Sequence, residues 1–178
     1  MSDDKKEKWM TWVALTTALM AVLAAVTTLY VGKYSSRAVL DQGQETNKWS
    51  YYQAKSIKSY IYEIQKQKLE LEILSQRGKL PVDVREQYQK VIAGYENKIK
   101  QYDKEKEEIK AEGDALAKNR VTAQSQAGNF GYSLIFLQIA IMLSSVAALT
   151  KKKPLWHLGL VTVAGWVFFF LDAIWLFY

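Results

Sequence analysis

Few side chains in this 178-residue sequence have a type and position that could support chemistry. Asp172 is the one carboxylate within a long apolar run, and such a residue is by default a candidate ion or proton site. Gln138 lies in the preceding apolar run, and antiparallel helices would bring it close to Asp172. We favour a structural hydrogen bond or an interfacial carboxylate over an ion or proton site, because these runs contain no second charge that could form a relay.

The remaining residues give no support to an enzyme. The chain has no cysteine and a single histidine, His157, so neither a thiolate nucleophile nor a zinc site is expected. It has no glycine-rich phosphate loop and no Ser/His/Asp set. Within residues 33–129 the lysines and arginines are mixed with carboxylates and form no basic block. We therefore predict a non-enzymatic protein without a cofactor, a metal or a nucleic-acid partner.

Three long apolar runs contain most of the hydrophobic residues. They cover residues 9–32, 130–150 and 155–178, and each reaches the ~20 residues that a helix needs to cross the hydrocarbon core of a bilayer. The first run is longer than the apolar core of a cleavable signal peptide, so we interpret it as a retained anchor. This pattern predicts an all-α membrane protein with three transmembrane helices.

The lysines beside the apolar runs predict the orientation. Residues 1–8 and the loop 151–154 carry six lysines, whereas four basic residues lie close to the runs within residues 33–129. Short segments rich in lysine and arginine stay in the cytoplasm. We therefore place residues 1–8 and 151–154 in the cytoplasm, and residues 33–129 and the C-terminus in the periplasm or outside the cell.

Residues 33–129 are predicted to form a long antiparallel helical hairpin, a coiled coil inserted between the first and second spans. Pro81 follows "RGKL", so the turn is expected at residues 76–82. Apolar residues recur every seven positions on both sides of this turn, which keeps one seam of each arm against the other arm. The predicted register places Leu71 opposite Tyr88, and the next pairs step seven residues along each arm. The predicted seam consists of Trp49, Ile57, Tyr60, Ile64, Leu71, Tyr88, Tyr95, Tyr102, Ile109 and Leu116.

The stretch "WSYYQAKSIKSYIY", residues 49–62, carries a second aromatic stripe on the helix face opposite to the predicted seam. We favour an interface with another copy or a protein partner there, over lipid headgroups and over a solvated face. This predicted interface consists of Tyr51, Lys55, Lys58 and Tyr62.

The first apolar run also carries small residues at intervals of three or four positions. Small side chains allow helix backbones to approach closely in lipid, so this stripe predicts tight helix packing. Its members are Ala14, Ala18, Ala21, Ala25 and Gly32.

The sequence resembles a bacterial membrane-protein family, the domain of unknown function 4337. The resemblance is carried by "KWMTWVALTTALMAVLAAVTTL" followed by "KWSYYQAKSIKSYIYE", and "WSYYQAKSIK" is its specific part. It extends to the order of an N-terminal span, a charged helical region and two C-terminal spans. The resemblance implies a protein of the bacterial inner membrane and implies no activity.

The function that we expect is that of a homo-oligomeric inner-membrane scaffold or adaptor. A two-helix hairpin of this length buries only a narrow stripe, so it needs further contacts, most simply with its own copies or with a protein partner. One alternative is a channel- or transporter-like oligomer with a pore between the spans. Another is an accessory subunit of a larger membrane complex.

Overall fold

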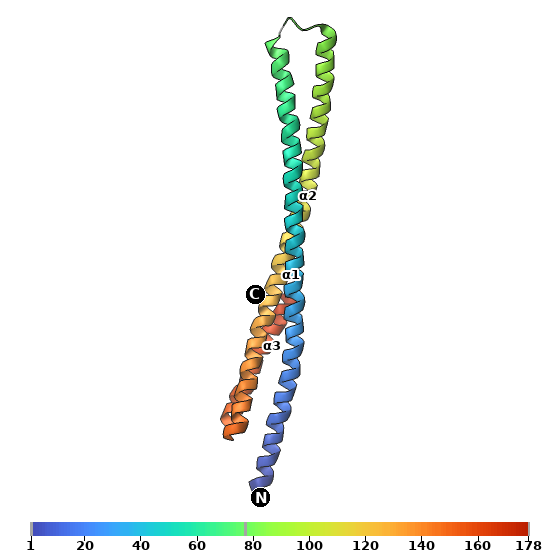
Figure 1. Cartoon of the computed structure of the whole chain (residues 1–178). Helices are drawn as coiled ribbons and strands as arrows, with labels where there is room; N and C mark the ends of the chain where they lie inside the picture. Colours follow the sequence, from blue (N-terminus) through green and yellow to red (C-terminus); the bar gives the residue numbers. More distant parts are fainter. Residues whose placement is uncertain (1, 77, 178) are drawn as a thin grey trace. The chain divides into compact units, whose positions relative to one another are not determined.

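The structure is a computed structural model that describes residues 2–76 and 78–177, with side chains from residue 8 onward. Within these ranges it has three helices and no strand (Figure 1). Helix α1 covers Ser2–Ser75, α2 covers Val82–Thr150 and α3 covers Lys153–Trp175. The all-α class predicted from the sequence is confirmed.

Each of the three helices contains a stretch that is long and apolar enough to cross a membrane. At most 28% of the residues in these stretches are buried inside the structure. Most of their apolar side chains therefore face outward, as expected of helices that lipid surrounds rather than helices in the core of a soluble protein. The prediction of three membrane-compatible helices is confirmed.

A short turn separates α1 from α2 and lies within the predicted segment 76–82. Gly78 has φ of +85°, in the left-handed region that glycine enters at little cost. Pro81 comes immediately before the first residue of α2, and its carbonyl accepts the first bond of that helix from the Arg85 N–H at 3.1 Å. Gly78 lies within the turn that the Lys79 N–H closes by donating to the Gln76 carbonyl at 2.9 Å, and the proline precedes the next helix, so these two residues fix the position of the turn.

The chain divides into two compact units, which are described separately. The apolar unit comprises Met1–Leu40 and Asn119–Tyr178, and the arm unit comprises Asp41–Lys118.

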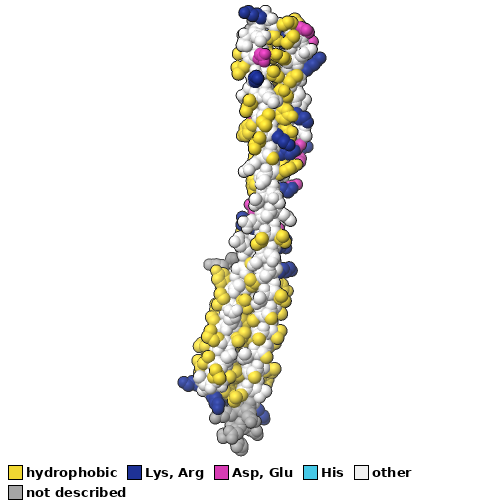
Figure 2. Space-filling model, viewed as in Figure 1, with side chains coloured by type: hydrophobic (Ala, Val, Ile, Leu, Met, Phe, Trp, Pro, Cys, Tyr) yellow, Lys and Arg dark blue, Asp and Glu magenta, His cyan; other side chains and the backbone are white. Residues whose placement is uncertain are grey.

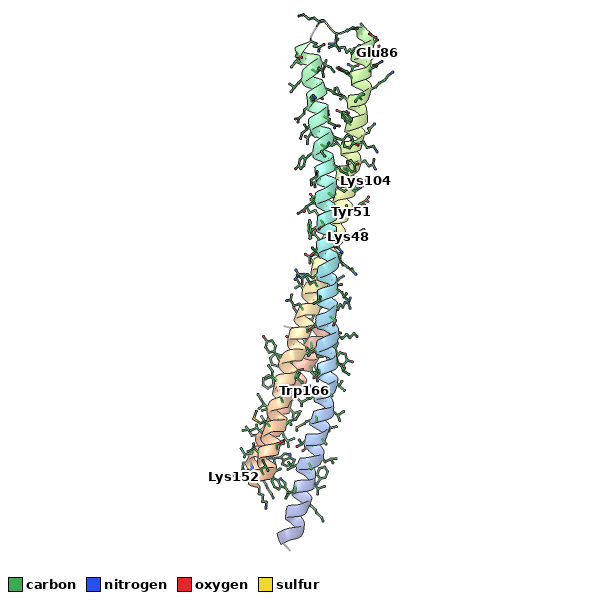
Figure 3. All side chains as sticks on the ribbon, in the orientation of Figure 1. Lys48, Tyr51, Glu86, Lys104, Lys152 and Trp166 are labelled. Atoms are coloured by element: carbon green, nitrogen blue, oxygen red, sulfur yellow. The ribbon has the colours of Figure 1, made fainter. Side chains whose placement is uncertain are left out.

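In the apolar unit, segments of all three helices enclose a small core. Met20 of α1 and Leu137 and Ala140 of α2 are buried together. The core is completed by half-buried side chains that include Val163 and Trp166 of α3, and Trp166 is marked in Figure 3.

Two glycines of α3 allow it to pack closely on α2. A Cβ atom at Gly159 would lie 3.1 Å from the backbone oxygen of Ala140, and one at Gly165 would lie 2.6 Å from the ring of Phe136. Neither position has room for a larger residue without a shift of a neighbour. The close approach of α2 and α3 therefore depends on these glycines, consistent with the role of small residues in membrane helix packing.

In the arm unit, α1 and α2 lie side by side and are joined by the turn (Figure 1). Side-chain contacts connect Glu72 with Tyr88 near the turn, Lys55 with Glu105 further along, and Lys48 with Glu112 beyond that. Contact partners thus move in opposite directions along the sequence, which is an antiparallel order.

Candidate functional site

The contact between α1 and α2 in the arm unit is built largely from charged and aromatic side chains. The Lys55 ammonium lies 2.6 Å from a carboxylate oxygen of Glu105, and its nitrogen lies 5.4 Å and 5.2 Å from the ring centres of Tyr51 and Tyr102. Only 17% of the Lys55 side chain is exposed. Lys55 therefore combines an ion pair with two cation–π contacts.

Two ion pairs of this contact shift the pKa values of the side chains that form them. The hydrogen bond to Glu105 raises the pKa of Lys55, and the same bond lowers the pKa of Glu105. Lys66 and Glu96, which are 2.6 Å apart, show the same pattern of a raised lysine pKa and a lowered carboxyl pKa. Each charged partner thus favours the ionised form of the other.

Aromatic rings and a buried serine fill the positions between these ion pairs. The Tyr62 ring lies between Tyr95 and Tyr102, with ring centres 5.5 Å and 5.9 Å away. Ser59 is only 5% exposed, and its hydroxyl donates a long 3.4 Å bond to Asp103. The face of α1 that contacts α2 is therefore mostly polar or amphipathic.

This contact differs from the predicted seam on α1. Trp49 does lie in it, against Gly113, where a Cβ atom would be 3.5 Å from the indole. The other predicted residues of α1 are exposed rather than buried against α2, with exposed fractions of 60% to 65%: Ile57, Tyr60, Ile64 and Leu71. Tyr60 is nevertheless close enough to α2 to help raise the pKa of Lys106. The prediction selected the most hydrophobic seven-residue repeat of α1, whereas α2 contacts the repeat that carries lysines, serines and tyrosines.

On α2, the structure places the predicted seam residues on the side of α1. Tyr88 donates a hydrogen bond to Glu72 at 3.3 Å, and Tyr95 and Tyr102 flank Tyr62. Ile109 is buried, and Leu116 is half-buried.

The structure also distributes the four residues of the predicted interface on the opposite face of α1 over different surroundings. Lys55 and Tyr62 belong to the contact with α2, because they carry the ion pair and the ring contacts described above. Tyr51 and Lys58 remain exposed, and Figure 3 marks Tyr51 and Lys48 on α1 of this unit. The four residues therefore do not form one outward surface.

A row of exposed apolar side chains appears instead on another face of α1, which we call the outer stripe. Its members are large hydrophobic side chains that are 48% to 65% exposed: Ile57, Tyr60, Ile61, Ile64, Leu71 and Leu74. Figure 2 shows hydrophobic side chains at the surface of the arm unit among lysines and carboxylates.

In the apolar unit, Asp172 pairs with Asn129 and not with Gln138, the partner predicted from the sequence. Asp172 is 2% exposed and accepts a 2.7 Å hydrogen bond from the Asn129 amide. Gln138 is exposed. Because Gln138 lies nine residues after Asn129, it is ~13 Å further along α2, too far to share the partner of Asn129.

Two tryptophan–threonine hydrogen bonds in the apolar unit connect α3 with α1, and the sequence analysis does not identify them. The indole N–H of Trp156 donates to the Thr16 hydroxyl, and that of Trp166 donates to the Thr27 hydroxyl, each at 3.2 Å. Their sequence signal is indirect: an indole N–H in an apolar helix needs an acceptor, and threonine hydroxyls are among the few available.

The predicted small-residue stripe of the first span does not pack against the other two spans. Its five members are exposed. Three of them, Ala14, Ala18 and Ala21, line an open groove of about 690 Å³ between α1 and α2. The close helix contact is made at Gly159 and Gly165 of α3 instead.

Aromatic and basic side chains gather at two levels of the apolar unit. Tyr30, Tyr34 and Phe170 surround the buried Phe130, with ring centres 5.1 to 5.4 Å from it. At a separate level, the Lys153 ammonium lies 6.0 Å from the Trp9 ring. Aromatic residues with neighbouring lysines are typical of the two interfaces of a membrane. Among the described residues, no group of three His, Cys, Asp or Glu side chains is placed to hold a metal ion.

These features define an all-helical protein whose three helices are compatible with a membrane. More specifically, the chain belongs to the family described as domain of unknown function (DUF4337), whose model matches residues 9–176. No curated protein and no solved structure matches the chain.

Proposed function

We propose that this protein is a non-enzymatic, homo-oligomeric scaffold or adaptor of the bacterial inner membrane. Three transmembrane helices anchor it, and the arm unit is an antiparallel coiled-coil hairpin outside the bilayer. The observation that carries the proposal is the outer stripe, a row of exposed large hydrophobic side chains on a helix whose contact with its own partner arm is built largely from charged and aromatic side chains.

The physical argument concerns which face of α1 should be covered. Ile64, at 64% exposure, and Leu71, at 65%, would lose unfavourable contact with water if another protein covered them. Lys55 and Ser59 face α2 and contribute little apolar burial. The arm unit therefore has its strongest drive for association on the outside, where a partner can reach it.

The proposed orientation places residues 1–8 and 151–154 in the cytoplasm and the hairpin in the periplasm. The lysines of the two short segments support it. Since the chain has no cysteine, Lys79→Cys near the turn and Lys152→Cys in the short loop form a matched pair of exposed positions. An impermeant thiol reagent added to intact spheroplasts should label Lys79→Cys alone. Labelling of Lys152→Cys alone would reverse the orientation.

A channel-like oligomer and an accessory subunit of a larger complex are weaker candidates. A channel needs polar groups that face water, but Thr27 donates to the Leu23 carbonyl and accepts from Trp166. The side chain of Asp172 is similarly held by Asn129. These polar groups serve contacts within one chain.

The test of the proposed function is the number of copies in a native membrane. Patches of membrane extracted without detergent, by a styrene–maleic acid copolymer, are analysed by native mass spectrometry. We expect two or more copies of the chain in one particle. Particles that contain one copy, at the expression level of the native gene, would refute self-association.

A further inference from the structure

We infer that the outer stripe joins two copies of this chain through a parallel, in-register contact between their α1 helices. This inference rests on the self-association proposed above. It adds the surface, the direction and the register of the contact.

The spacing within the outer stripe is that of a coiled coil. Ile57, Ile64 and Leu71 recur every seven residues. A second series, offset by three positions, places Tyr60 and Leu74 at its two ends. These series occupy the two core positions of a heptad, which pack against a partner helix in a coiled coil. The repeat spans 18 residues, or ~27 Å of helix.

The area and the distribution of apolar residues favour a second copy as the occupant. At roughly 100 Å² of exposed surface for each of six large side chains, the outer stripes of two copies together offer roughly 1,200 Å², the lower end of the range for stable interfaces. Within the arm unit, the large hydrophobic residues that α2 exposes are Val82 and Val91, too few for a matching stripe. The best complement that the chain offers to the outer stripe is therefore the same stripe of another copy, in a two-fold symmetric contact.

The charges beside the outer stripe select the parallel direction. Glu63 and Lys68 are exposed and lie on opposite flanks of the stripe, five residues apart. In a parallel, in-register pair, Glu63 of one copy faces the partner's Lys68 across the core, and symmetry creates this pair twice. An antiparallel pair would instead bring each flank against the same flank of the other copy and juxtapose like charges. Copies that are anchored in one membrane with the same orientation also run in the same direction.

Gln67 selects the register. It is exposed and occupies the core position between Tyr60 and Leu74. When the register is matched, the two Gln67 amides meet and can hydrogen bond with each other. A shift by one heptad would place each amide against tyrosine or leucine and leave its polar groups without partners, which is costly in a buried contact. A single polar core residue is a known determinant of coiled-coil register.

Cysteine cross-linking in native membranes tests the surface. Gln67→Cys lies in the stripe, whereas Gln65→Cys is exposed two residues away on another face of α1. Under mild oxidation, we expect Gln67→Cys to form a disulfide-linked dimer at least tenfold faster than Gln65→Cys. Equal rates, or a cross-link from Gln67→Cys to a different protein, would overturn the inference. The copy number in the copolymer-extracted membrane particles then separates the two proposals. Particles with several copies would leave self-association intact and refute only this surface. Particles with one copy would refute both proposals.

A charge exchange tests the direction. Glu63→Lys should weaken association roughly threefold to tenfold, because two opposite-charge pairs become like-charge pairs. The double variant Glu63→Lys with Lys68→Glu should restore it. Fluorescence energy transfer between labelled copies in vesicles measures the effect. Stronger association of the single variant would overturn the parallel arrangement, because Glu63→Lys relieves repulsion only in an antiparallel pair.

Discussion

The contact of α3 with α2 at Gly159 can be tested by adding one methyl group there. Comparison with a control glycine-to-alanine substitution separates the cost of tighter packing from the higher helix propensity of alanine. In Gly159→Ala, the new Cβ atom would lie 3.1 Å from the Ala140 backbone oxygen and 3.2 Å from the Ser144 hydroxyl. A backbone atom cannot rotate away, so α2 and α3 must move apart by a few tenths of an ångström. Overpacking of this kind costs ~1–3 kcal/mol.

Gly131→Ala is the matched control, because a Cβ atom there has no neighbour within 4 Å. Both variants gain the ~1 kcal/mol by which alanine is favoured over glycine inside a helix. This gain cancels in the comparison. The free energy of unfolding of Gly159→Ala should therefore lie ~1–3 kcal/mol below that of Gly131→Ala, and Gly131→Ala should be at least as stable as the unaltered protein.

The assay is reversible unfolding in mixed micelles of a mild detergent and an increasing fraction of dodecyl sulfate. Tryptophan fluorescence reports mainly on the apolar unit, because Trp49 is the one tryptophan of the arm unit. Equal unfolding midpoints for the two variants would refute the close contact of α2 and α3 at Gly159.

Three other contacts lead to further predictions. Gly165→Ala should be ~1–3 kcal/mol less stable than Gly131→Ala, since its Cβ would lie 2.6 Å from the Phe136 ring, and this cost of the Gly165→Ala change should be smaller when it is measured in a Phe136→Ala background. Thr27→Val removes the acceptor of an indole N–H and should cost ~0.6 kcal/mol, an average value for membrane helices; an unchanged midpoint would contradict it. The pKa of Glu105 is lower in the folded protein than the ~4.3 of a glutamate in an unfolded chain. Its ion pair therefore stabilises the arm unit at pH values above ~4.3. As the pH falls below ~4.3 and the carboxyl becomes protonated, the arm unit should lose this stability. Near-ultraviolet circular dichroism of the tyrosines follows this loss, and a profile unchanged by Glu105→Gln would refute the role of the ion pair.

The helices and the turn could be predicted because their signals are local. Apolar runs of about 20 residues are sufficient for the three membrane-compatible stretches. Gly78 and Pro81 are sufficient for the turn, because each restricts or permits backbone angles by its own covalent structure.

The face of α1 that contacts α2 could not be predicted from hydrophobicity because α1 carries two seven-residue repeats. One contains Ile57 and Ile64, and the other contains Lys55 and Tyr62. Hydrophobicity favours the first, but α2 presents carboxylates that pair with the lysines of the second. A search for opposite charges across the turn would have found the correct face.

The partner of Asp172 was missed for a different reason. Asn129 lies one residue before the apolar run that begins at Phe130, so a search restricted to the runs excludes it. Hydrogen bonds between helices depend on the relative height and rotation of two segments, and one sequence does not specify either. The same reason applies to the two tryptophan–threonine bonds.

The polar composition of the contact between α1 and α2 in the arm unit has a thermal consequence. Exposure of apolar surface on unfolding raises the heat capacity by ~0.45 cal/mol/K per Å², whereas exposure of polar surface lowers it by ~0.26. Separation of the arms exposes both kinds of surface: the aromatic rings around Tyr62 and the buried Ile109 are apolar, whereas Lys55, Glu105, Lys66 and Glu96 are charged. The charged atoms offset part of the heat-capacity increase that the apolar atoms cause. A single copy of the arm unit should therefore have a heat-capacity change below the ~12–15 cal/mol/K per residue of globular proteins, and its stability should vary less with temperature than that of a hydrophobic core of the same size.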